Sequence, residues 1–342
     1  RKDADMKAIQ VQDYGASDML ALAEVETPGL EDGEALVRIS HAGINFIDVY
    51  MRAGIFKCSR TYQNSPPFTP GMEAAGIVEA VGAGVDSGVD GIKPGDRVAY
   101  CLSLGSYAEF AAVPAWKLIK VPKGVAMDAA CALQLQGMTA HYLTHSLYPL
   151  KDGDSCLIHA GAGGMGQLAI QMAKIRGAKV FVTVGSPEKA EIAKQRGADH
   201  AILYREVDFA EAVRELTSGE GVNVVYDSVG KDTIRQSLKC LKPRGMLSNN
   251  GNASGRIEAI DPLDLAEAGS VFFTRPHLAD YIPTPDARRE RCDDLFRLYA
   301  DGKLTVTIDR TFPLADAKAA HDAIEGRRSK GKMLLETGSE GL

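Results

Sequence analysis

The sequence predicts an α/β protein in which a doubly wound parallel sheet is inserted into a mainly β domain. The chain has 342 residues, which is enough for two domains. Its first part contains short strands separated by Gly and Pro turns, as in a small antiparallel barrel. From residue 155 the pattern changes to strands that alternate with helices, which is typical of a parallel sheet with right-handed crossovers.

The N-terminal strands and loops account for the barrel. Residues 35–40 alternate between apolar and polar side chains, and residues 71–82 form a strand interrupted by glycines. Residues 42–50 are expected to be a loop that enters a short helix. Residues 54–71 contain three prolines and are expected to be a long surface loop, which in compact domains is often functional. A helical pattern covers residues 128–147.

Six strands are expected in the second part, with helical patterns between most of them. They are residues 155–160, 179–184, 200–203, 222–227, 244–249 and 270–274. Past residue 275 the alternation stops, and the tail, with a helix over 288–299 and a strand over 305–308, is expected to return to the first domain.

The predicted domain organisation follows from this change of pattern. Residues 6–130 and 272–342 are expected to form one catalytic domain, and residues 131–271 the inserted nucleotide-binding domain. An insertion of this kind creates a cleft between domains, where ligands commonly bind.

Composition excludes several classes of protein. The net charge of −6 argues against a nucleic-acid or membrane-surface binder. The six cysteines are scattered without a Cys-x-x-Cys pair, so neither a disulfide framework nor a zinc cluster is expected. The sequence contains no apolar run long enough to span a bilayer and no recognisable signal peptide. We therefore expect a cytoplasmic protein.

The stretch from Ser155 to Gly166 has the order required for dinucleotide binding. An apolar strand runs into the turn Gly161-x-Gly163-x-x-Gly166, and a helical pattern follows. Gly161 permits the tight turn, Gly163 lets the backbone approach a pyrophosphate, and Gly166 lets the helix pack close to the sheet. The helix N-terminus then offers free N–H groups to the phosphates.

The end of the next strand favours NADP over NAD. NAD sites usually carry an acid about twenty residues after the last glycine, to bind the ribose hydroxyl. Here Gly185 and Ser186 occupy that position, and Lys189 follows one turn later. A hydroxyl and an ammonium attract the 2′-phosphate of NADP, which a carboxylate would repel. Ser186 could instead serve only as the N-cap of the following helix, with Lys189 a solvated residue.

Several motifs together resemble one enzyme family. They are residues 43–48, 73–76, 92–98, the glycine turn, 225–230, 251–255 and 274–276. The chain resembles the zinc-independent quinone oxidoreductases of the zeta-crystallin type, in the medium-chain dehydrogenase/reductase superfamily. The resemblance implies a GroES-like catalytic barrel, a Rossmann domain, NADPH, a homodimer, and hydride transfer to a quinone.

The resemblance also carries over site residues. Asn45, Asp48 and Tyr50 would lie near the nicotinamide, and Ser186, Lys189 and Tyr204 would contact the 2′-phosphate. The full set of implied cofactor contacts is Asn45, Asp48, Tyr50, Thr139, Tyr142, Gly163, Gly164, Met165, Gly166, Gly185, Ser186, Lys189, Tyr204, Ser228, Asn250, Gly251, Asn252, Arg275, His277 and Arg327. For Tyr142 and Ser228, a role as a satisfied polar core residue is nearly as well supported. Gln136 and Asn250 depart from the family pattern.

No metal is expected. Zinc-dependent members of the superfamily place Cys near Asn45 and a His where this chain has Met72, and neither present residue is a good zinc ligand. His321 is expected to lie at the surface or to support a site residue, and not to bind a metal. Without a Lewis acid, a quinone is a suitable acceptor because it is already reactive toward hydride. Asn45 and Tyr50 could stabilise the developing oxyanion, or could only position the nicotinamide.

Two other functions remain open at this point. The same cofactor could reduce an activated C=C bond, in an enone or alkenal. Alternatively, the chain could be a cofactor-binding structural protein, as crystallin relatives are. The intact glycine turn argues against the loss of cofactor binding.

Overall fold

The computed structural model describes residues 5–62, 64–85 and 91–338. They divide into two compact units. The first unit contains the chain up to Met138 and from Ile282 onward, and the second contains Thr139–Tyr281.

The second unit begins and ends later than the nucleotide-binding domain predicted over residues 131–271. Residues 131–138 pack with the first unit, where the Cys131 thiol lies 3.5 Å from the His41 carbonyl. At the other end, residues 272–274 form a strand of the second unit's sheet and therefore belong to that unit.

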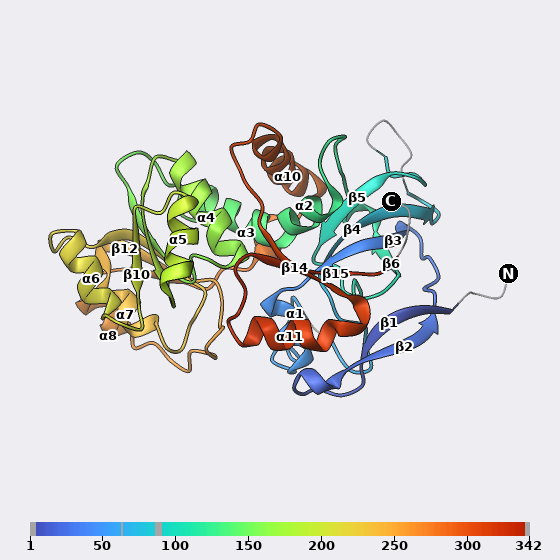
Figure 1. Ribbon diagram of the computed structural model, residues 1–342, viewed down its shortest axis with the longest axis horizontal. Coiled ribbons are helices and arrows are strands. Elements are labelled where there is room, and N and C mark those ends of the chain that lie inside the picture. Colours follow the sequence, from blue (N-terminus) through green and yellow to red (C-terminus); the bar gives the residue numbers. More distant parts are fainter. Residues whose placement is uncertain (1–4, 63, 86–90, 339–342) are drawn as a thin grey trace. The chain divides into compact units, whose positions relative to one another are not determined.

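The first unit is mainly β. Its larger sheet has the strand order β14-β15-β3-β4-β5-β7, with β6 paired to β3, and a separate hairpin joins β1 to β2. The strands are β1 Asp5–Val11, β2 Leu20–Glu26, β3 Glu34–Gly43, β4 Glu73–Val81, β5 Arg97–Cys101, β6 Phe110–Pro114, β7 Ile119–Lys120, β14 Ile308–Pro313 and β15 Lys332–Glu336. Its helices are α1 Phe46–Arg52, α2 Met127–Ala132, α10 Pro285–Ala300 and α11 Ala317–Glu325. Figure 1 shows α1 and α11 side by side, and Arg52 bonds Glu325 across them at 2.8 Å.

The second unit is a doubly wound parallel sheet of order β10-β9-β8-β11-β12-β13. Its strands are β8 Ser155–Ile158, β9 Lys179–Val184, β10 His200–Leu203, β11 Val222–Asp227, β12 Leu241–Asn249 and β13 Phe272–Thr274. Its helices are α4 Gly164–Ile175, α5 Pro187–Gln195, α6 Phe209–Leu216, α7 Ile234–Lys239, α8 Pro262–Glu267 and α9 Leu278–Tyr281. In Figure 1, α4 and α5 cover one face of the sheet, and α6, α7 and α8 cover the other.

The core of the second unit follows from the period-two alternation of its strands. Leu157, Phe181, Val225 and Leu247 lie side by side on adjacent strands and are fully buried. They pack under residues of α6, α7 and α8. Because alternate side chains share a face, the residue two positions later on each strand meets the same helices at the carboxyl edge of the sheet.

Most predicted elements are present, with two instructive differences. Residues 127–147 form a continuous helical stretch in which α3 (Met138–Tyr142) lies between two π-turns, Leu133–Gly137 and Leu143–Leu147. The strand expected over residues 305–308 instead runs over Ile308–Pro313, where it pairs with β15.

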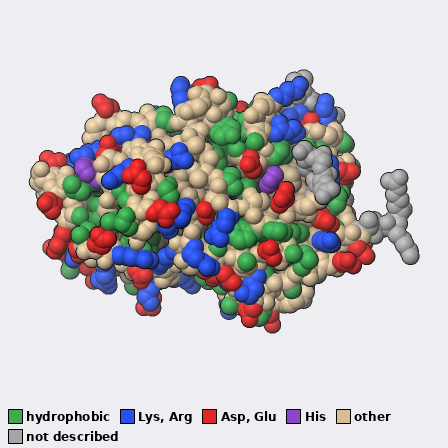
Figure 2. Space-filling model, in the orientation of Figure 1, with side chains coloured by type: hydrophobic (Ala, Val, Ile, Leu, Met, Phe, Trp, Pro, Cys, Tyr) green, Lys and Arg blue, Asp and Glu red, His purple; other side chains and the backbone are tan. Residues whose placement is uncertain are grey.

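The surface agrees with the composition. Figure 2 shows basic and acidic side chains interspersed on the face in view. Among the described residues, no helix combines the length and the apolar character that crossing a membrane requires.

Candidate functional site

The glycine turn of the second unit has the close packing that its sequence predicts. A Cβ on Gly161 would lie 2.7 Å from the Val182 Cβ, and one on Gly166 would lie 2.3 Å from the Ala160 carbonyl oxygen. On Gly163 a Cβ would meet only that same oxygen, at 3.3 Å. The outer two glycines are therefore required by the fold. The middle one leaves its outer side open at the start of α4, where the first helical N–H groups need acceptors.

A basic cluster lies at the end of β9. Ser186 is the N-cap of α5, because its hydroxyl accepts a hydrogen bond from the Lys189 N–H at 3.3 Å. A Cβ on Gly185 would lie 3.1 Å from the Tyr204 hydroxyl and 3.4 Å from Arg205 Nε. Ser186, the Lys189 backbone and the Tyr204 hydroxyl thus lie at the end of β9, and their contact with a 2′-phosphate stays a prediction. Arg205 also lies at this place and was not predicted. The sequence did offer a signal for it, a basic residue directly after Tyr204.

Two loops at the carboxyl ends of β11 and β12 carry further predicted contacts. A Cβ on Gly251 would lie 2.5 Å from the Ser228 carbonyl oxygen, so glycine is needed for the loops to approach. The Asn249 amide holds the Gly251 carbonyl at 2.7 Å. Asn250 Oδ1 is buried without a hydrogen-bond partner among the described residues. An unsatisfied buried acceptor of this kind fits a site that receives a polar ligand.

The other predicted contacts in this unit are more local. Tyr142 is buried and its ring stacks on Tyr281 with centroids 4.2 Å apart, so its ring belongs to the packing. Arg275 bonds the neighbouring Pro276 carbonyl at 3.2 Å. Burial and the charge of Arg275 lower the pKa of His277. Thr139, Gly164, Met165, Ser228 and Asn252 are half-buried.

In the first unit, the Asn45 side chain is held at the N-terminus of α1. Its Oδ1 accepts hydrogen bonds from Lys332 Nζ at 2.8 Å and Gln136 Nε2 at 3.2 Å. Its Nδ2 donates to Glu73 Oε2 at 2.9 Å and to the Gly43 carbonyl at 3.4 Å. The amide therefore has a fixed orientation, and both of its hydrogens have acceptors within the protein.

Glu73 and Lys332 form a buried ion pair beside Asn45. Lys332 Nζ lies 2.5 Å from Glu73 Oε2, and both side chains are at most 2% exposed. The second carboxylate oxygen accepts from the Leu135 N–H at 2.5 Å. A Cβ on Gly43 would lie 1.9 Å from Glu73 Oε2, so only glycine fits there. The Lys332 ammonium thus lies between Asn45 and Glu73 and neutralises the Glu73 carboxylate.

Asp48 is fully buried and begins a chain of polar groups. Its Oδ2 accepts from the Asn45 N–H at 2.9 Å and the Tyr107 hydroxyl at 3.1 Å, while Oδ1 has no partner among the described residues. Burial raises the pKa of the Asp48 carboxyl to about 7, although the Asn45 hydrogen bond and the Lys332 charge oppose the shift.

His321 continues this chain and is buried, which corrects its possible placement on the surface. Its Nε2 lies 3.1 Å from the Tyr107 hydroxyl, and its Nδ1 lies 3.0 Å from Arg52 NH1. Burial and the Arg52 charge lower the pKa of His321 to about 3. A neutral ring that accepts from Arg52 must donate from Nε2 to Tyr107, which in turn donates to Asp48. No short-range pattern in the sequence indicated this association.

Tyr50 and Arg327 complete the predicted contacts of the first unit. Tyr50 lies on α1, is 8% exposed, and its ring contacts Phe46 and Phe56 with centroid distances of 5.9 and 5.8 Å. Arg327 is exposed just beyond α11. The predicted site residues therefore divide into two sets, one in each unit.

Comparison with known proteins gives a family match for each of the two units. The alcohol dehydrogenase GroES-like domain matches residues 31–123, and the zinc-binding dehydrogenase family matches residues 164–278. Quinone oxidoreductase 1 of Escherichia coli is 40% identical over 96% of this chain and 98% of its own. The 2-haloacrylate reductase of a Burkholderia species is 43% identical over 96% and 98%.

Solved structures agree with these relatives. The crystal structure of Escherichia coli quinone oxidoreductase complexed with NADPH covers 97% of this chain and 100% of its own, with 39% identity and a TM-score of 0.92. That of 2-haloacrylate reductase covers the same shares, with 41% identity and a TM-score of 0.83. The predicted fold, a Rossmann sheet inserted in a GroES-like domain, is confirmed. The chain belongs to the quinone oxidoreductase family of the medium-chain dehydrogenase/reductase superfamily.

Proposed function

We propose that this protein is an NADPH-dependent quinone oxidoreductase. The observation that carries the proposal is the glycine turn together with the basic cluster at the end of β9, where no acid occupies the ribose position. The turn leaves room for a pyrophosphate at the start of α4. The hydroxyl of Ser186 and the charges of Lys189 and Arg205 fit a 2′-phosphate. Relatives of this chain include a quinone oxidoreductase solved with NADPH.

Within this proposal the second unit holds the cofactor and the first unit contributes Asn45, Asp48 and Tyr50 near the nicotinamide. When bound, NADPH supplies the hydride that, with one proton, converts a quinone into a hydroquinone. The residues of this chain bind and orient the reactants and exclude water. Thr139, Tyr142, Asn252, Arg275, His277 and Arg327 remain proposed contacts.

The ion pair in the first unit supports a reaction without zinc. Lys332 places a positive charge between Asn45 and Glu73, where zinc-dependent relatives are expected to hold their metal. A cation would be repelled there, and Asn45 and Met72 are poor ligands. An acceptor that needs no Lewis acid, such as a quinone, suits this arrangement.

We assign the oxyanion role to Tyr50 and a positioning role to Asn45, because both amide hydrogens of Asn45 already have acceptors. In steady-state assays with 1,4-benzoquinone, Y50F should lower kcat about tenfold or more if its hydroxyl donates in the transition state. The matched control is Y62F, which removes a hydroxyl from the same aromatic cluster. A kcat for Y50F equal to that of Y62F would refute the oxyanion role.

The preference for NADPH can be tested without disturbing the helix. S186D keeps an N-capping side chain, because Asp and Ser cap equally well, but adds a negative charge beside the 2′-phosphate. We expect the Kd for NADPH to rise about tenfold or more, with the Kd for NADH unchanged or lowered and the Tm preserved. If NADPH binding by S186D matched that of the parent, Ser186 would be a helix cap only.

A second candidate is reduction of an activated C=C bond, which the relation to 2-haloacrylate reductase favours. Parallel assays with 1,4-benzoquinone and a simple enone separate the two, and our proposal requires the larger kcat/KM for the quinone. A crystallin-like structural role would instead give NADPH binding without turnover of either compound.

Four further statements stay predictions. A homodimer is supported by β13, an edge strand whose Phe272 is 59% exposed, since an open apolar edge favours pairing. The mixed surface charge supports the expectation of no nucleic-acid partner. A cytoplasmic location and the absence of a membrane partner are likewise predicted.

A further inference from the structure

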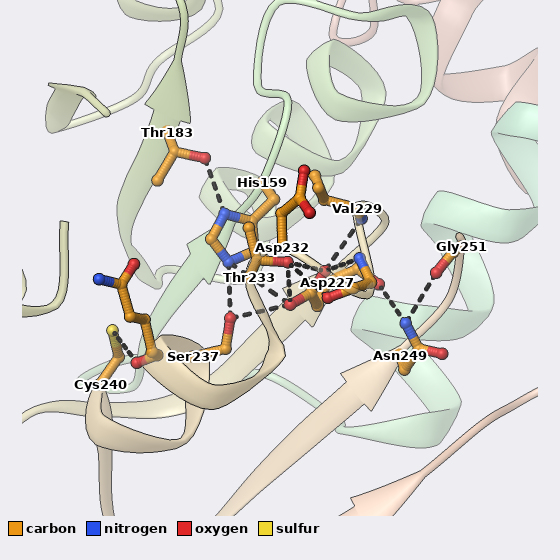
Figure 3. Close-up of polar contacts among 12 residues, drawn as sticks. His159, Thr183, Asp227, Val229, Asp232, Thr233, Ser237, Cys240, Asn249 and Gly251 are labelled. Atoms are coloured by element: carbon orange, nitrogen blue, oxygen red, sulfur yellow. Dashed lines mark hydrogen bonds and ion pairs between the residues drawn. The ribbon is translucent and has the colours of Figure 1, made fainter. Parts of the chain in front are cut away.

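A row of polar side chains crosses the carboxyl edge of the second unit's sheet. Asp227 on β11 is paired in register with Asn249 on β12. His159 follows β8 directly, beside Asp227 on one side and Thr183 of β9 on the other. All four side chains are at most 3% exposed. They continue the face that carries the apolar row of the core. Figure 3 shows His159 and Asp227 meeting Ser237 of α7, while the Asn249 amide is directed to Gly251.

The hydrogen bonds in this row have one possible direction when the Asp227 carboxylate is ionised. Ser237 donates its only hydroxyl hydrogen to Asp227 Oδ2 at 2.8 Å. Ser237 Oγ must then accept from His159 Nε2, which lies 2.9 Å away. Burial lowers the pKa of His159, against the Asp227 charge, so the ring is neutral. His159 Nδ1 therefore accepts from the Thr183 hydroxyl at 2.7 Å.

Asp227 is the acceptor toward which these donors point, and it also orders the loop after its own strand. Asp227 Oδ1 accepts the N–H groups of Val229 and Gly230, each at 2.9 Å. The Thr233 hydroxyl lies 2.8 Å from both carboxylate oxygens. This loop contains Ser228, a proposed cofactor contact. The Asp227 carbonyl additionally accepts the Asn250 N–H at 2.8 Å, which fixes the second loop.

Thr183 connects the same row to the glycine turn. Its carbonyl accepts the Gly161 N–H at 3.2 Å, while its hydroxyl bonds His159. His159 is itself two residues before Gly161, and its N–H is held by the Tyr226 carbonyl at 3.1 Å. One connected set of side chains thus joins the turn after β8, the end of β9, and the loops after β11 and β12.

We propose that Asp227 is a positioning residue for the cofactor, which fixes His159 as the Nε2–H tautomer through Ser237 and so holds the glycine turn in register with the loops at 228–230 and 250–252. This inference rests on the proposed binding of NADPH. It adds a link between loops that would otherwise contact the pyrophosphate and ribose independently. Asp227 and His159 need not touch the cofactor, because they act through the backbone of those loops.

The tautomer can be observed without any cofactor. In ¹⁵N-resolved NMR spectra of the histidine rings, His159 of the parent should be neutral near pH 7 with its proton on Nε2. D227N supplies an amide N–H to Ser237, which can then donate to His159 Nε2, so the proton should move to Nδ1. H159Q identifies the signal. A parent ring with its proton on Nδ1, or a doubly protonated ring, would overturn the inference.

Binding tests the functional half of the claim. We expect D227N to raise the Kd for NADPH about tenfold, with the KM for 1,4-benzoquinone within about twofold of the parent. A purely structural role would lower the Tm and leave the Kd unchanged below the transition. Unchanged NADPH affinity in folded D227N would therefore refute the proposal.

A milder pair of variants serves if D227N does not fold. T183V removes the hydroxyl that donates to His159 at nearly constant volume, and T183S keeps it. We expect T183V to raise the Kd for NADPH about fivefold and T183S to stay within about twofold of the parent. Equal affinities for the two would overturn the inference. If the parent itself bound no NADPH, the proposed function would fail, whereas the tautomer assignment would still be decided by NMR.

Discussion

The two units hold buried polar groups in different ways. In the first, a carboxylate and an ammonium, Glu73 and Lys332, neutralise each other at 2.5 Å. In the second, the carboxylate of Asp227 is surrounded by neutral N–H and hydroxyl donors. An ion pair cannot lose one partner without leaving a buried charge, whereas hydroxyls can rotate and a neutral imidazole can move its proton. The first region should therefore be the more sensitive to single substitutions.

The largest expected effect comes from removing the buried ammonium. K332M leaves the buried Glu73 side chain without its counter-charge, and we expect the free energy of unfolding to fall by about 3–5 kcal/mol. Urea denaturation measures this loss. The matched double variant E73Q/K332M keeps an acceptor for the Leu135 N–H without a charge, so it should recover at least half of the loss. A loss below about 1 kcal/mol in K332M would contradict the account, because it would mean that Glu73 does not depend on Lys332 to balance a buried charge.

A smaller effect is expected where a hydroxyl, and not a counter-charge, is removed. Y107F removes the hydroxyl between Asp48 and His321, and leaves the His321 N–H without its acceptor. We expect a loss of about 1–3 kcal/mol in urea denaturation. Y100F is the control, because the Tyr100 hydroxyl is buried with no partner among the described residues. It should be neutral or stabilising, and equal losses in the two variants would contradict the chain from Asp48 to His321.

The pH dependence of stability sharpens the description of the first unit. The folded-state pKa of Asp48 is raised to about 7 from its ordinary 3.8, so the protonated carboxyl favours the folded state. This contribution is complete below about pH 4 and is lost as the pH rises through about 7. The stability of the parent relative to D48N should therefore fall over that range, by about 4 kcal/mol at most. His321 is present in both chains and cancels. A difference independent of pH would mean that Asp48 is ionised throughout.

The smallest effect is expected at Ser186, which is half-buried and lies outside the buried polar networks of the two units. S186A removes the N-cap of α5, and should lower the free energy of unfolding by about 1 kcal/mol in urea denaturation. S186D should restore it while impairing NADPH binding. If S186A were as costly as Y107F, the ranking of fully buried above half-buried polar groups would be wrong.

Local patterns in the sequence were sufficient for the cofactor-binding half of the fold. The strands β9, β10 and β11 have the predicted bounds, because each is an apolar run that ends at a turn signal. The glycine turn and the cap at Ser186 are likewise local features. They required only the spacing of neighbouring residues.

The buried polar clusters of the first unit could not be predicted from local patterns. Lys332 begins the short strand β15 and has the sequence pattern of a solvated charge, yet its partner is Glu73, far earlier in the chain. The same holds for Tyr107 and His321. Contacts between distant segments leave no period or spacing in one sequence. The ends of β8 and β11 did carry a signal, since each apolar run stops there at a polar residue on the core face, His159 and Asp227.

The central claim is that NADPH, held by the second unit, reduces a quinone without a metal. The most direct measurement is anaerobic rapid mixing of the protein and NADPH with 1,4-benzoquinone after treatment with a chelator, following NADPH absorbance. We predict that one equivalent of NADPH is oxidised per quinone, more slowly when the transferred hydrogen at C4 is deuterium. NADPH that remains unbound, or that is bound but not oxidised until zinc is added, would contradict the account.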